Sequence, residues 1–159
     1  MQGFSFCLLA FFIFSVENAT LINGGKGGAN VIQRFIELGE GYADIYELIQ
    51  TAKANQHRLA HLMVLQTEIN GKEVISPVVI LHPTDPGKFQ ALYVCREGIP
   101  NPKKLPNKRF DLFMQTAGEL GKQIIELDVK PSTMFPDKEL YYQHLIGILR
   151  MNRYIPPLQ

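Results

Sequence analysis

A chain of 159 residues, of which 46% are hydrophobic and 19% charged, is long enough for one globular domain with its own core. The formal net charge of +1 excludes a strong electrostatic field that would steer the protein toward nucleic acid or an anionic membrane. The two cysteines, Cys7 and Cys95, are far apart and form neither a disulfide framework nor a zinc motif, which favours a reducing, cytoplasmic setting.

The first thirty residues differ from the rest of the chain. The run FSFCLLAFFIFSV at 4–16 is apolar and uncharged, but it is shorter than the roughly 20 residues that cross a bilayer, and no basic residue precedes it as in a signal peptide. Lys26-Gly27-Gly28 can be encoded by the purine tract that pairs with bacterial ribosomal RNA, and Val31 by an alternative start codon. We therefore expect translation to start at Val31; a disordered or cleaved leader at 1–30 is the alternative.

Residues 31–159 are then expected to form a single domain. The segment VIQRFIEL at 31–38 is rich in β-branched and aromatic residues, which predicts a strand. After Gly39 and Gly41, residues 42–54 carry apolar side chains at helical spacing and predict a helix.

Three strands are predicted next. The first half of 58–69 is apolar on both faces, as in a buried central strand. Asn70-Gly71 is the strongest short hairpin signal, because both turn positions need a positive φ. Residues 72–82 return as the partner strand, in which Pro77 predicts a bulge or an edge position. Residues 88–97 make the third antiparallel strand.

The last third of the domain alternates helix, strand and helix. A proline-rich basic loop at 98–108 precedes a helix at 109–121, with Gly121 as its stop. A strand at 122–129 and a helix at 136–154 follow. The apolar stripes of the two helices are predicted to contain Phe110, Phe113, Met114 and Ala117 in the first, and Leu140, Tyr141, Leu145, Ile148 and Leu149 in the second.

The order is strand, helix, three-strand meander, helix, strand, helix. This order predicts an α+β fold in which a mixed, mostly antiparallel sheet carries helices gathered mainly on one face. Strands buried on both faces would require a helix on the other face as well.

The segment ELGEGYADIYEL at 37–48 resembles the glycine-rich strand-turn of small-molecule kinases such as methylthioribose kinases. Nearly all of residues 31–159 also resembles a family of short Firmicutes proteins of unknown function, some of which carry a methylthioribose kinase label. The kinase resemblance implies phosphoryl transfer with a strand lysine, a catalytic aspartate and a magnesium-binding aspartate.

The residues outside the glycine-rich segment do not complete that machinery. None of the four histidines is followed by an aspartate two positions on, and Lys53 falls in the predicted helix. Asp85-Pro86-Gly87 is similar to the metal-binding triplet, but no catalytic loop precedes it. We interpret Gly39 and Gly41 as a strand-to-helix turn and predict no cofactor.

A helix that starts after Gly41 can still present free N–H groups to an anion. The candidate ligand-binding residues are therefore Gly39, Gly41, Tyr42 and Ala43. Four cations in the loop, Lys103, Lys104, Lys108 and Arg109, form a candidate anion or partner surface, with a solvated basic loop as the alternative.

Other catalytic arrangements are incomplete. His57 and His61 have i, i+4 spacing, but the glutamate of the zinc-protease pattern is missing and no metal site is predicted. A metal-dependent nuclease would pair Asp85 with a Glu-x-Lys on the next strand, and no lysine follows Glu97 in that pattern. Cys95 lies in an apolar strand and is interpreted as a small hydrophobic core residue.

These observations predict a small cytoplasmic bacterial domain without catalytic residues that works by binding or self-association. The alternatives are a methylthioribose-kinase-like protein or a nuclease-like hydrolase. A homo-oligomer could use an exposed sheet edge or the last helix with Tyr141, Tyr142 and Tyr154. No nucleic-acid partner and no membrane span in residues 31–159 are predicted.

Overall fold

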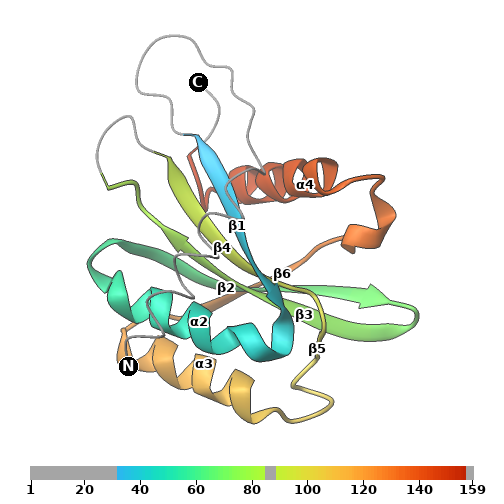
Figure 1. Cartoon of the computed structure of the whole chain (residues 1–159), viewed down its shortest axis with the longest axis horizontal. Helices are drawn as coiled ribbons and strands as arrows, with labels where there is room; N and C mark the ends of the chain where they lie inside the picture. Colours follow the sequence, from blue (N-terminus) through green and yellow to red (C-terminus); the bar gives the residue numbers. More distant parts are fainter. Residues whose placement is uncertain (1–31, 85–88, 157–159) are drawn as a thin grey trace.

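A computed structural model of the chain describes residues 32–84 and 89–156, with the side chains of 39–44 left out of the description. The predicted leader at 1–30 lies outside these residues. The elements follow the predicted order, with one further short strand and two 3-10 turns (Figure 1). They are β1 (Gln33–Glu40), α2 (Gly41–Ala54), η1 (Gln56–Arg58), β2 (Leu59–Ile69), β3 (Lys72–Leu81), β4 (Gln90–Arg96), β5 (Ile99–Pro100), α3 (Lys108–Glu119), β6 (Ile124–Asp128), η2 (Ser132–Met134) and α4 (Lys138–Met151).

The sheet has the strand order β1-β4-β3-β2-β6, and β5 pairs with β3 beside β4. The β2–β3, β3–β4 and β3–β5 pairs are antiparallel, whereas β1–β4 and β2–β6 are parallel. The α+β class is therefore correct, but the sheet is mixed and not mostly antiparallel. The difference arises because α2 and α3 each carry the chain back to the end of the sheet where the preceding strand began, so β2 follows the direction of β1 and β6 that of β4.

Helices cover both faces of the sheet. Figure 1 shows α2 and α3 on one face and α4 on the other. Side chains of β1 alternate between the two sides, since Ile36 and Leu38 join the core under α2 and α3 while Phe35 joins the core under α4. The two-sided burial predicted for the central strand β2 is confirmed, and α4 is the helix that makes it possible.

The predicted buried stripes of α3 and α4 need three corrections, of which the smallest is Ile148 of α4, which is only partly buried. Met114 is 53% exposed, because α3 packs through Phe110, Phe113 and Ala117 and turns Met114 away from the core. Leu140 is 41% exposed, because the buried face of α4 is rotated toward Tyr142 and Ile146.

The burial predicted for Tyr141 is confirmed, but the tyrosines of α4 do not form the predicted self-association surface. Tyr141 and Tyr142 are buried against the sheet, and the Tyr142 ring stacks on Phe35 with 4.4 Å between ring centroids. They therefore form core and not a surface for self-association. Burial raises the pKa of both phenols.

The predicted hairpin is confirmed, since Asn70 and Gly71 have φ values of 53° and 78°. The prediction for Pro77 was wrong, because β3 is central and its pairing with β2 continues through Pro77 and Val64 without a break. Pro77 lies between the stretches of β3 that pair with β5 and with β4. Pro77 has no N–H to donate to β4. The hydroxyl of the neighbouring Ser76 donates to the Cys95 carbonyl and satisfies that acceptor.

Candidate functional site

A cleft of about 490 Å³ lies between α3 and the sheet. Its floor is apolar and comes from three neighbouring strands: Val64 of β2, Ile75 of β3 and Ile124 of β6. Alternate residues of a strand face the same side of a sheet. The parallel pairing of β2 with β6 therefore places Val64 and Ile124 on one face.

The wall of the cleft is one side of α3. Asn107 caps the start of this helix, because its side-chain oxygen accepts hydrogen bonds from the backbone N–H groups of Arg109 and Phe110, at 2.8 and 3.1 Å. Ala117 and Gly118 keep the wall low beside β6, and a Cβ added to Gly118 would meet no atom within 4 Å. The cleft is therefore open because small residues stand where α3 passes the edge of the sheet.

Polar side chains surround the rim. Glu126 accepts a hydrogen bond from Gln66 at 2.5 Å and pairs with Lys103 at 3.3 Å. The buried Asn101 side chain accepts from the backbone N–H of Lys103 at 3.0 Å and so fixes the loop that closes one end. The rim also includes Asp111, Lys122 and Gln123. The residues that line the cleft supply apolar contact and hydrogen bonds, and they include no histidine, cysteine or hydroxyl side chain.

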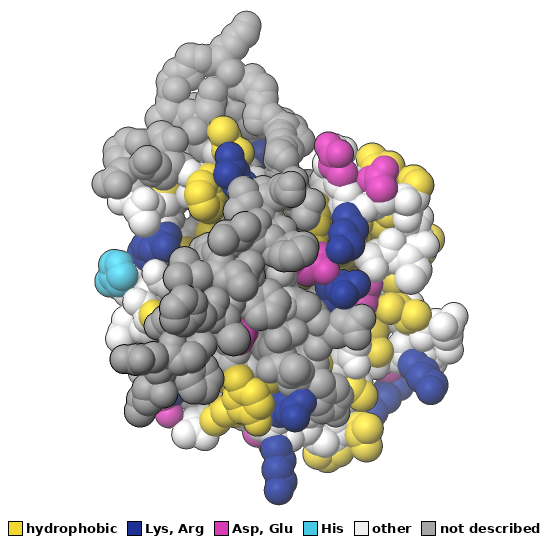
Figure 2. Space-filling view, viewed as in Figure 1, with side chains coloured by type: hydrophobic (Ala, Val, Ile, Leu, Met, Phe, Trp, Pro, Cys, Tyr) yellow, Lys and Arg dark blue, Asp and Glu magenta, His cyan; other side chains and the backbone are white. Residues whose placement is uncertain are grey.

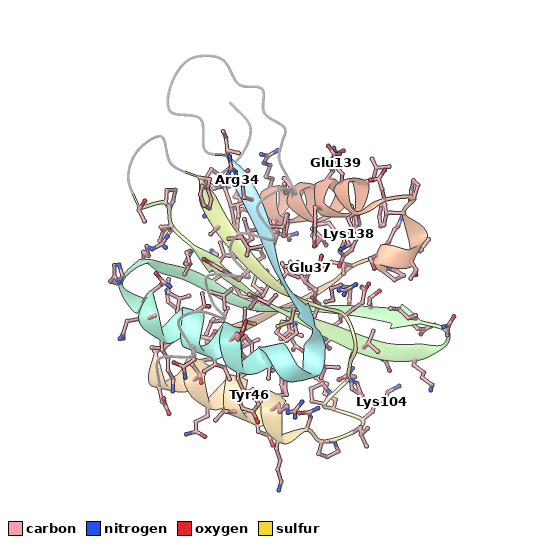
Figure 3. All side chains as sticks on the ribbon, in the orientation of Figure 1. Arg34, Glu37, Tyr46, Lys104, Lys138 and Glu139 are labelled. Carbon is pink, nitrogen blue, oxygen red and sulfur yellow. The ribbon has the colours of Figure 1, made fainter. Side chains whose placement is uncertain are left out.

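A second polar arrangement lies on the opposite face, where α4 meets the ends of the parallel strands β1 and β4. Glu37 is only 12% exposed, and its carboxylate accepts from Arg96 at 2.7 Å, from Lys138 at 3.3 Å and from the Tyr142 hydroxyl at 2.6 Å. Figure 3 shows Glu37 and Lys138 between the sheet and α4, with Glu139 on the far side of that helix. We call Glu37, Arg96, Lys138 and Tyr142 the Glu37 cluster.

The Glu37 cluster borders a small cavity of about 70 Å³. Glu97 lies beside it and accepts from the backbone N–H of Ser132 at 3.2 Å and from the Ser132 hydroxyl. Donors therefore already engage both carboxylates. The Glu37 cluster joins β1, β4 and α4, and the contact of Glu97 with Ser132 adds η2. Its chemistry is that of a structural anchor.

The predicted glycine site falls at the boundary of two elements. β1 ends at Glu40 and α2 begins at Gly41, so the strand-to-helix turn is where the sequence predicted it. The side chains of Tyr42 and Ala43 lie outside the described residues, as does Asp85. Lys53, the lysine after the loop, is in α2 and lies 3.8 Å from Glu119.

The predicted basic surface is divided by acidic neighbours. Lys103 pairs with Glu126, and Lys104 pairs with Glu73, whose pKa it lowers. Lys108 begins α3, and the Arg109 guanidinium lies 5.6 Å from the centre of the Tyr46 ring. Figure 2 shows basic and acidic side chains adjoining on the described part of the face in view. A uniform cationic surface is therefore not present in this loop.

The other predicted residues are dispersed. Cys95 is fully buried, as expected of a small hydrophobe. His57 lies in η1 and His61 in β2, so their i, i+4 spacing is not helical. No group of three or more metal-ligating side chains occurs within residues 32–84 and 89–156.

A family model described as a domain of unknown function (DUF7147) matches residues 31–155. The chain belongs to this family. No curated protein and no solved structure matches the chain. The resemblance to a family of unknown function is therefore confirmed, whereas the Firmicutes origin and the methylthioribose kinase label stay predictions.

The residues of the cleft in this DUF7147 domain were largely missed by sequence reasoning. Lys103 is the one lining residue that the sequence singled out as a surface candidate, and it did so for a different reason. A signal was present in Gly118, which lies inside a predicted helix where glycine costs helix stability. A glycine inside a helix often marks a position where a side chain would fill space that a neighbouring group or a ligand occupies.

His61 gives the DUF7147 domain an acid-sensitive position. Burial, Lys122 and His82 all lower its pKa, and burial together with Lys130 lowers that of His144. In the unfolded chain both histidines have the ordinary pKa of about 6.5, so the unfolded chain binds more protons than the folded one at acidic pH. We therefore expect the stability to fall as the pH drops from 7.5 to 5.5. Urea unfolding of His61→Gln/His144→Gln should show a shallower dependence. An unchanged slope would contradict this assignment.

Proposed function

We propose that this domain is a non-catalytic binding protein whose ligand is a small, largely apolar molecule held in the cleft beside α3. The proposal rests on the size and lining of this cleft. Its volume of about 490 Å³ lies within the range of roughly 300 to 1,000 Å³ that is typical of small-molecule pockets. Its apolar floor with polar groups at the rim is also the usual composition of such sites.

The rim narrows the chemistry of the ligand. The Glu126 carboxylate already accepts from Gln66 and pairs with Lys103, so this corner of the cleft presents a neutral, hydrogen-bonded surface to a ligand. Lys122 is half-buried, and its ammonium donates to the Ala60 carbonyl at 3.4 Å, which leaves it two further N–H donors for a ligand. We infer an amphiphilic ligand that lays its apolar part on Val64, Ile75 and Ile124 and directs one polar or anionic group toward Lys122.

A binding role is favoured over a catalytic one. The cleft presents no nucleophile–base pair among its lining residues, and its carboxylates, Asp111 and Glu126, come from different elements and are both exposed. Catalytic carboxylates usually lie close together in a desolvated site, whereas these two face water from separate elements. Self-association is the other part of the expected role.

A cleft-filling substitution tests the proposal. Gly118→Phe adds a ring beside the cleft at a position where an added Cβ meets nothing within 4 Å. We expect the variant to bind the apolar, anionic fluorophore 1-anilinonaphthalene-8-sulfonate at least tenfold more weakly than the unchanged chain. The chain contains no tryptophan, which simplifies the fluorescence titration.

The matched control is Gly147→Phe. Gly147 is an exposed glycine of α4 on the opposite face of the sheet, and a Cβ there also meets nothing within 4 Å. We expect this variant to bind the fluorophore like the unchanged chain. Equal binding by all three proteins, or no binding by the unchanged chain, would refute the proposed site. A thermal shift with magnesium and ATP that survives Gly118→Phe would instead favour the kinase alternative.

A further inference from the structure

The strand β6 forms one edge of the sheet. It pairs with β2 on one side, from Leu62–Ile124 to Gln66–Asp128, and no strand of the described structure pairs with its other side. An edge strand presents a row of N–H and C=O groups that another strand can complete. Its apolar residues, Ile124, Ile125 and Leu127, are only partly buried.

This edge is short and carries two carboxylates, but it lacks two other features that often keep edge strands apart, a proline and a β-bulge. β6 contains no proline, and its ladder with β2 runs in regular register. The other edge strand, β1, has a register shift between Glu37 and Gly39, which is a common form of edge protection. Within the described residues the two edges of the sheet therefore differ, and β6 is the edge without a register shift.

We propose that β6 pairs antiparallel with β6 of a second copy of this chain, about a two-fold axis that passes through Ile125. The pairing joins the two sheets into one continuous sheet. It goes beyond ligand binding, and it shares Lys122 and Ile124 with the lining of the cleft.

The charges of the strand select this register. In a two-fold pair each residue must face a residue of the same sheet face, so the axis has to pass through a residue of the strand. An axis at Glu126 or Asp128 places identical carboxylates opposite each other, and an axis at Leu127 places Glu126 opposite Asp128. Like charges directly opposite destabilise a strand pair.

Two registers without such repulsion remain, and Ile125 is the better centre. An axis at Ile124 would bring the pairing quickly to Gly121, whose φ of 70° interrupts an extended strand. An axis at Ile125 pairs residues 122–128 throughout. It places Lys122 opposite Asp128 of the second copy and diagonal to Glu126, and it does so twice because of the symmetry. The sequence from 122 to 128 is therefore charge-complementary to itself.

Neighbouring elements add to the contact. Met114 is 53% exposed and lines the cleft together with Ile124, so it stands next to this edge on the α3 face. Ile125 and Leu127 pack on the core under α4 and would lose their remaining exposure against the second copy. The interface thus buries apolar side chains on both faces of the joined sheet, as a pair of strands alone would not.

Charge reversal provides the test, and Asp128 is the first position because it is exposed and does not line the cleft. Sedimentation velocity of the full chain over a concentration series should show a species of twice the 18.0 kDa chain mass. Asp128→Lys places two lysines opposite each other at each end of the interface and should weaken dimerisation about tenfold or more. Lys122→Glu should weaken it similarly, and Lys122→Glu/Asp128→Lys should restore it.

Each outcome decides the matter. Restoration by the double substitution supports the register, because a merely structural defect would accumulate and not cancel. A chain that stays monomeric up to about 100 μM, or a dimer that neither single substitution weakens, would overturn the proposal. Hydrogen exchange at low and high concentration supplies a second measurement that needs no variant. The amides of residues 122–128 should become protected as the dimer forms, and a dimer without that protection has another interface.

Discussion

Replacing Phe113 with alanine is expected to lower the free energy of unfolding by about 4 kcal/mol. Phe113 is fully buried where α3 packs on the sheet and on α2, and its ring lies 6.2 Å from that of Phe110. Removal of the ring loses its transfer free energy and leaves a cavity that the β-sheet cannot fill by collapsing. Urea or thermal unfolding followed by circular dichroism measures the change.

The adjacent Met114 is the matched control. It belongs to the same helix turn and is 53% exposed, so Met114→Ala should change the stability by less than about 1 kcal/mol. The sequence pattern placed both side chains in the core, and the structure separates them. Comparable losses for the two variants would show that α3 is rotated relative to the structure described above.

The second large effect is expected at Glu37. Glu37→Gln removes the negative charge from the Glu37 cluster and leaves Arg96 and Lys138 facing each other without their shared carboxylate. Breaking one member of a buried ion pair is strongly destabilising, but Arg96 and Lys138 are 44% and 58% exposed and water compensates them in part. We therefore expect a loss of about 2 kcal/mol in the free energy of unfolding.

Glu139→Gln is the corresponding control on the other side of α4. It removes the same charge from an exposed residue, next to Lys138 in the sequence and away from the sheet (Figure 3), and should change the stability by less than about 0.5 kcal/mol. Addition of salt should weaken the difference only slightly, since Glu37 is 12% exposed. Equal losses in both variants would mean that the Glu37 cluster does not anchor α4.

Local signals made most of the fold predictable. The Asn70-Gly71 turn requires a left-handed backbone at two successive positions, and few other residue pairs adopt it at low cost. Gly121, with a φ of 70°, ends α3 where the sequence placed a stop. The element order follows from such short-range chemistry, which acts on neighbouring residues and does not depend on the tertiary structure.

Strand direction and the sites depend on residues that are distant in the sequence. The Glu37 cluster joins β1, β4 and α4, and a hydrogen bond spans 105 positions between Glu37 and Tyr142. The cleft likewise assembles β2, β3, β6, α3 and the loop at 101–103. Periodicity shows which side chains share a face but not which faces meet, so neither arrangement could be derived from the sequence pattern.

The mixed sheet also has a kinetic consequence. The β2–β3–β4 meander is built from neighbouring segments, whereas β1 must find β4 across the gap from Gln33 to Gln90. Closing long loops costs entropy before any contact compensates for it, which slows the pairing of distant segments. The nascent chain is therefore expected to form the meander first and to complete both outer strands late, so its folding nucleus lies in the middle of the sequence.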